Sequence, residues 1–85
     1  MSDTNHLVRE IGTRIRRLEG VIRNFKEGRR RLEQLYQSSE GETRSLIEQA
    51  LIVNQGAIEA RERDLQSEKV RLLLVRSTLV TPPQT

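Results

Sequence analysis

Apolar residues recur along the first half of the chain in alternating steps of three and four. Arg29 occupies the one polar position in a series that otherwise runs Val8, Ile11, Ile15, Leu18, Ile22, Phe25, Leu32 and Tyr36. These are the a and d positions of a heptad repeat, which is typical of a long amphipathic helix that packs on other helices. The pattern predicts a helix over residues 5–37, with a capping or frayed segment at residues 1–5.

A second series with the same steps follows in the other half. Its a and d positions are Ile47, Leu51, Asn54, Ile58, Arg61, Leu65, Glu68, Leu72, Val75 and Leu79. This series predicts a second helix over residues 43–80. Pro82 and Pro83 cannot continue a helix, so residues 81–85 are expected to form a disordered tail.

The two series are out of register by one residue, which corresponds to about 100° of rotation on an α-helix. A single continuous helix would turn its apolar side away at that point, so we expect a turn at residues 38–43, "SSEGET". Gly41 is suited to a left-handed conformation, and Ser39 with Glu42 fits a capping box for the second helix. The predicted fold is therefore all-α, an antiparallel two-helix hairpin that resembles a coiled coil.

If the chain folds back at this turn, facing residues have numbers that sum to about 80, so that Ile22 meets Ile58. The d positions match less well. Their apolar members on the first helix would face Glu68, Arg61 and Asn54, and they are expected to need another neighbour. We therefore assign a packing or oligomer interface to Ile11, Leu18, Phe25 and Leu32.

The second helix carries a further apolar series at heptad positions c and g, which comprises Leu46, Ala50, Val53, Ala57 and Ala60. A helix with two apolar sides packs on two other helices, and small alanines allow close approach. We expect the hairpin to dimerise into a four-helix bundle. A second expected contact is an apolar tip beyond the start of the first helix, formed by Leu73, Leu74, Val75 and Leu79.

The composition favours a chain that gains stability by packing on a partner. Of its 85 residues, 34% are apolar and 32% are charged, and a core of this size is marginal. There is no cysteine and only one histidine, His6, so no metal site and no cofactor are expected, and enzymatic activity is not expected. The start "MSDTNHL" lacks the features of a signal peptide, and we expect a cytoplasmic protein.

Charge is concentrated in the first helix, where residues 1–37 contain nine Lys/Arg and five Asp/Glu. Arginines at position b, with two more at position c, form a ridge that comprises Arg9, Arg16, Arg17, Arg23, Arg30 and Arg31. Such a row suits phosphates or an acidic surface. A solvated helix face is nevertheless the favoured interpretation, because the pairs Glu10–Arg14, Glu19–Arg23 and Glu27–Arg31 have the favourable spacing.

Arg29 differs from the ridge because it occupies an a position. Such a residue either sets the register of the helix pair or extends its charge from the end of the bundle into water.

These patterns favour a non-catalytic protein–protein interaction module, such as an adaptor, a small chaperone or an assembly factor. Its expected partners are a second copy of itself and another protein. The alternative is RNA or DNA binding through the arginine ridge. Peripheral membrane binding by "VRLLLVRSTLV" ranks last, and no small-molecule ligand is expected.

Overall fold

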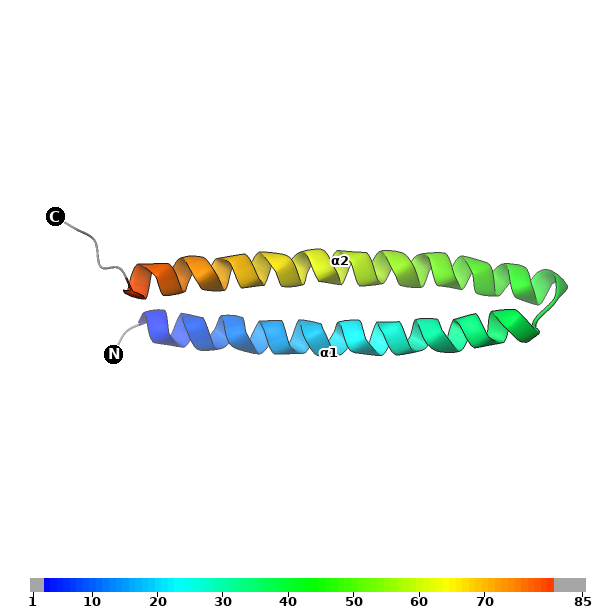
Figure 1. Cartoon of the computed structure of the whole chain (residues 1–85), viewed down its shortest axis with the longest axis horizontal. Coiled ribbons are helices and arrows are strands. Elements are labelled where there is room, and N and C mark those ends of the chain that lie inside the picture. Colours follow the sequence, from blue (N-terminus) through cyan, green and yellow to red (C-terminus); the bar gives the residue numbers. More distant parts are fainter. Residues whose placement is uncertain (1–2, 81–85) are drawn as a thin grey trace.

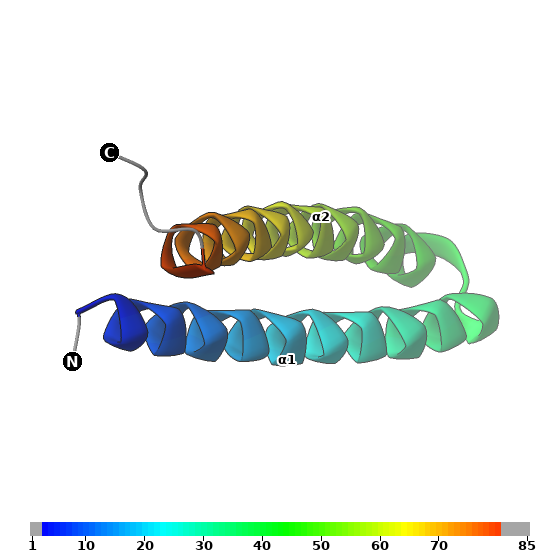
Figure 2. The same cartoon turned by 60° about the vertical axis from the view of Figure 1, so that its left-hand side comes forward.

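The computed structural model describes the backbone of residues 3–80 and the side chains of residues 4–78. The chain forms helix α1, Asp3–Ser38, and helix α2, Gly41–Val80. Figures 1 and 2 show the two helices side by side, with the start of α1 and the end of α2 at the same end of the molecule. The molecule measures 69 × 20 × 14 Å. The predicted all-α antiparallel hairpin is confirmed.

The helices are slightly longer than the sequence predicted, because α1 begins two residues earlier and ends one residue later, and α2 begins two residues earlier. Only Ser39 and Glu40 separate them. The predicted tail at residues 81–85 lies outside the described residues. No described helix contains an apolar stretch long enough to cross a membrane.

The turn depends on Gly41, whose φ is +62°, so its predicted left-handed conformation is confirmed. The predicted capping box is wrong. Glu40, not Ser39, lies directly before the first residue of α2, and the Ser39 hydroxyl instead donates to the carbonyl of Leu35 at the end of α1. The backbone N–H of Ser39 donates to the carbonyl of Tyr36, 3.3 Å away. These bonds satisfy carbonyl groups that the last turn of α1 leaves unpaired.

The core is thin. Among the described residues, only Ile11, Ile22 and Ile58 are buried apolar side chains. Ile22 and Ile58 belong to the layer that the predicted register places together. Residues at the same level have numbers that sum to about 80 to 82, as Tyr36 beside Arg44 and Arg14 beside Glu68 show. The predicted register is therefore close to the observed one.

Polar groups join the helices at several seam positions. The side-chain amide of Asn54 donates to the carbonyl of Phe25, 3.1 Å away, and the Arg61 guanidinium lies 5.5 Å from the centre of the Phe25 ring. Arg29 donates from Nη1 to Oε1 of Gln55, 2.8 Å away. Arg29 thus points across to α2, which favours its interpretation as a residue that sets register over one that extends from the bundle end.

The expectation that Ile11 needs a neighbour outside the hairpin is wrong. It faces a polar position in the predicted register, yet its exposed fraction is 0% in the isolated hairpin. A side chain in a helix pair packs among several residues of the facing helix, so one polar neighbour does not leave it uncovered. Ile11 therefore needs no second subunit. Leu18, Phe25 and Leu32 remain half-buried.

Candidate interaction surfaces

The second apolar side of α2 is open in the hairpin. Leu46 is 58% exposed and Val53 is 73% exposed, while Ala50, Ala57 and Ala60 are half-buried. No described residue of α1 covers the two larger side chains enough to bury them. The positions that the sequence assigns to a further helix contact are thus uncovered within one chain.

α1 adds apolar side chains on the same side of the hairpin. Leu7 and Val21 are half-buried, and Leu35 is 54% exposed. Val21 lines two adjacent hollows, one shared with residues of α2 around Asp64 and one shared with Asn54. We call this side of the hairpin the groove face. It comprises Leu7, Val21 and Leu35 on α1 and Leu46, Ala50, Val53, Ala57 and Ala60 on α2.

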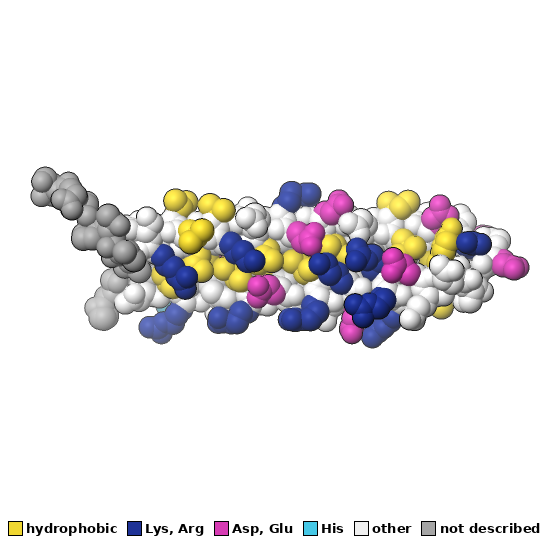
Figure 3. Space-filling model, in the orientation of Figure 1, with side chains coloured by type: hydrophobic (Ala, Val, Ile, Leu, Met, Phe, Trp, Pro, Cys, Tyr) yellow, Lys and Arg dark blue, Asp and Glu magenta, His cyan; other side chains and the backbone are white. Residues whose placement is uncertain are grey.

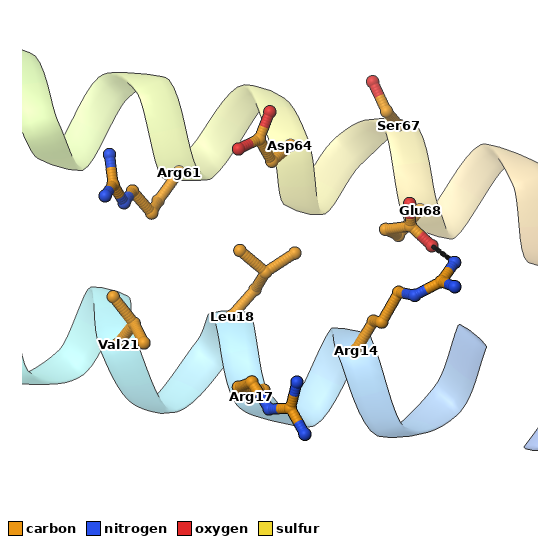
Figure 4. Close-up of a pocket in the computed structure, with 8 residues that line it drawn as sticks. All are labelled: Arg14, Arg17, Leu18, Val21, Arg61, Asp64, Ser67 and Glu68. Carbon is orange, nitrogen blue, oxygen red and sulfur yellow. Dashed lines mark ion pairs between the residues drawn. The ribbon is translucent and has the colours of Figure 1, made fainter. Parts of the chain in front are cut away.

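Charged residues surround the larger hollow of the groove face, which has a volume of about 440 Å³. Figure 4 shows Leu18 and Arg14 pointing from α1 toward α2, where Arg14 meets Glu68, while Arg17 is turned away from α2. Arg14 forms an ion pair with Glu68, with 3.6 Å between Nη1 and Oε1. Among the described residues, Arg17 and Asp64 form no ion pair within 4.0 Å. They are therefore available to a partner.

Two buried oxygens next to the groove face have no hydrogen-bond donor among the described residues. They are Oδ1 of Asn54 and Oε1 of Glu68, the latter lying just beyond hydrogen-bond distance of Arg14. Each residue lines one of the two hollows. A buried acceptor without a donor costs about 1–3 kcal/mol, and this cost applies to Asn54 more than to Glu68, whose charge is paired with Arg14 at 3.6 Å.

The predicted apolar tip is only partly open. Leu73 and Leu74 are 66% and 65% exposed, but Val75 is half-buried. Leu72 lies beside Val8 and Gly12 of α1, as the predicted register of the two helices requires. The side chain of Leu79 lies outside the described residues. Val70, which the sequence analysis did not assign, is also exposed beside this tip.

The arginine ridge lies on the surface of α1, and all six of its members are exposed. Figure 3 shows a row of basic side chains along the α1 edge and a line of apolar side chains between the helices. Arg31 lies 4.0 Å from Glu27, and Arg16 donates to the hydroxyl of Thr13 at 3.4 Å. Among the described residues, the expected Glu19–Arg23 pair does not form within 4.0 Å.

One member of the positive surface comes from α2. Arg76 joins Arg9 and Arg16 around a hollow of about 300 Å³, which Val8 and Leu72 also line. Arg76 was not predicted as part of this surface because the ridge was defined from the first helix alone. The antiparallel register, which places Arg76 close to the level of the first turns of α1, contains the signal that would have found it.

Within the described part of the chain, no three His, Cys, Asp or Glu residues come together as a group that would hold a metal ion. His6 lies on the surface, 3.1 Å from Glu10. Comparisons with protein-family models, with curated proteins and with solved structures find no match for this chain.

Proposed function

We propose that this protein is a non-catalytic interaction module, of the adaptor, small-chaperone or assembly-factor kind, that packs its groove face on helices of a partner. The observation that supports the proposal is the exposure of Leu46 and Val53 on a hairpin with only three buried apolar side chains among its described residues. Leu46 and Val53 lie on one side of α2, next to Leu35 of α1, whereas the exposed Ile52 and Leu73 lie on another side of the helix.

The energetics favour such a contact. Fully burying a Leu or Val side chain contributes roughly 1.5–3 kcal/mol relative to full exposure, and because Leu46 and Val53 are already partly covered, burying the rest of both contributes a few kcal/mol at most. The helix surface between and beyond these two residues carries only small side chains, those of Ala50, Ala57 and Ala60. Small side chains allow a partner helix to approach closely.

A matched pair of variants tests the proposal. Val53→Asp places a charge on the groove face, and Ile52→Asp places the same charge on a neighbouring residue that is equally exposed, at 69%, but points to another side of α2. In affinity capture from the source cells, wild type and Ile52→Asp are expected to retain the same bound proteins. Val53→Asp is expected to lose them. Equal retention by both variants would contradict the proposal.

Nucleic-acid binding by the arginine ridge is the second candidate, and the hollow shared by Arg9, Arg16 and Arg76 favours it. Three guanidinium groups around one hollow suit a phosphate, and the remaining ridge would follow a nucleic-acid backbone. The test is a mobility shift with structured RNA and duplex DNA at about 50 mM salt. Arg16→Gln and Arg76→Gln are expected to weaken binding, whereas Arg63→Gln on the exposed side of α2 is not. The absence of a shift for wild type would exclude this candidate.

A further inference from the structure

We infer that the occupant of the groove face is a second copy of this chain, related to the first by a two-fold axis parallel to the long axis of the hairpin. This inference rests on the proposed function, since it names the partner of the same surface. In this arrangement α1 of each copy lies on α2 of the other, and neighbouring helices are antiparallel throughout the resulting four-helix bundle.

The symmetry of this dimer fixes the register between the two copies, because neither copy can slide along the axis relative to the other. Rotation about an axis parallel to the helices leaves every residue at its own level, so a residue of α1 meets the α2 residue of the second copy that lies at its own level within the hairpin. Within the hairpin, such residues have numbers that sum to about 80 to 82. The same rule therefore identifies the contacts between copies.

At three levels this rule brings apolar residues of the two copies together, while Val53 meets Gly28 of the second copy, which has no side chain to obstruct it. Ala57 and Ala50 meet Asn24 and Arg31 of the second copy. At the turn end, Leu35 meets Leu46 of the second copy, and both are more than half exposed in the single chain. In the middle, the half-buried Val21 meets Ala60 of the second copy, and at the other end Leu7 meets Leu74 of the second copy. Because the dimer is symmetric, each contact occurs twice.

Charged residues are also complementary. Arg17 meets Asp64 of the second copy, and Glu10 meets Arg71 of the second copy at the next charged level. All four side chains are exposed in the hairpin. These pairs of opposite charges thus favour one orientation of the two copies and also stabilise the dimer.

The other way to stack two groove faces uses a two-fold axis across the helices, which places α1 on α1 and α2 on α2. With Leu46 set against Leu74 of the second copy, Asp64 then meets Gly56 of the second copy. With Leu7 set against Leu35 of the second copy, Arg17 meets Phe25. The interface would then cover the charges of Asp64 and Arg17 with neutral residues, which is energetically unfavourable. The parallel axis leaves Arg31 against Ala50 but pairs both Arg17 and Glu10 with opposite charges, so charge complementarity favours it.

The opposite side of the hairpin is unsuited to self-association. There Arg9 and Arg16 of α1 share a hollow with Arg76 of α2, so two copies stacked on this side would bring like charges together. This side is the one that remains free when the groove faces are closed.

Disulfide trapping tests the arrangement cleanly, because the chain has no cysteine of its own. Leu35→Cys and Leu46→Cys are prepared as separate proteins and mixed under mild oxidation. We expect the mixture to give a disulfide-linked dimer containing one chain of each kind, whereas neither variant alone does so efficiently, since a disulfide needs Cα atoms within about 7 Å. A mixture of Leu46→Cys with Leu74→Cys is the control, and efficient linkage there would show the crosswise axis and overturn the inference.

Charge exchange gives an independent readout by light scattering. Arg17→Glu and Asp64→Lys are each expected to raise the dimer dissociation constant about tenfold or more, because each change affects two symmetric contacts. The double variant Arg17→Glu/Asp64→Lys is expected to recover dimerisation, which separates a lost contact from a lost fold. Failure of the double variant to recover, while its helix content is unchanged, would overturn the inference. A wild-type monomer that still captures another protein through Val53 would also overturn it, yet leave the proposed function standing.

Discussion

The side-chain amide of Asn54 on α2 donates a hydrogen bond to the backbone carbonyl of Phe25 on α1, 3.1 Å away, while its own Oδ1 is buried without a donor among the described residues. A polar residue inside a helix seam ties one helix to a fixed level of the other, because its hydrogen bond forms in only one register. It does so at a cost in stability. Asn54, together with Arg29 bound to Gln55, therefore specifies the level at which the hairpin closes.

Asn54→Leu is expected to raise the free energy of unfolding by about 1 kcal/mol, because it removes the unpaired buried oxygen and adds apolar contact. The same change is expected to relax register, which would appear as a broader distribution of masses in light scattering. Gln66→Leu, at an exposed position of α2, is the control and should change stability by less than about 0.5 kcal/mol. A substantial loss of stability in Asn54→Leu would contradict this account of Asn54.

The thin core makes Ile58 a sensitive position. Ile58 is 1% exposed, so Ile58→Ala removes buried volume and is expected to cost about 2–5 kcal/mol in urea unfolding. Ile52→Ala changes the same residue type at an exposed site of the same helix, and its expected effect is below about 0.5 kcal/mol in the hairpin. Similar losses for the two variants would mean that Ile58 is not part of the core.

The turn is expected to need glycine at one position only. Gly41 has a φ of +62°, so Gly41→Ala should lower the free energy of unfolding by about 1 kcal/mol through backbone strain, even though an added Cβ meets nothing within 4 Å. Gly56 lies within α2 and has equally open surroundings among the described residues. Gly56→Ala should raise the free energy of unfolding by about 1 kcal/mol, since alanine is the better helix former. Thermal unfolding of the two variants should therefore move in opposite directions.

The seam of a and d positions was sufficient to predict two helices, the turn at Gly41 and a register that pairs Ile22 with Ile58. These features depend on periodicity, which the sequence displays directly. Ile11 was misjudged because a heptad letter assigns one facing residue, whereas packing involves several. The role of Ser39 was misjudged because α2 begins at Gly41, which places the Ser39 hydroxyl within reach of Leu35 on the preceding helix.

Some residues of the candidate surfaces could be predicted from the sequence and others could not. Leu46 and Val53 stood out because they repeat along one helix, and they are indeed uncovered in the hairpin. Arg76 and the unpaired oxygens of Asn54 and Glu68 depend on how two helices face each other, so no pattern along one helix contains them. The periodicity of one helix therefore predicts which side of it is apolar, but it does not predict which polar groups of the two helices lie together beside that side.

The central claim is that Val53 and its neighbours on the groove face are covered by another helical chain, and the molar mass in solution tests it most directly. Light scattering is measured for wild type, Val53→Asp and Ile52→Asp over a range of concentrations. Wild type and Ile52→Asp are expected to approach twice the chain mass of 9.9 kDa, while Val53→Asp remains near 9.9 kDa. A wild-type mass of 9.9 kDa at every concentration, with no binding of an apolar dye, would contradict the claim.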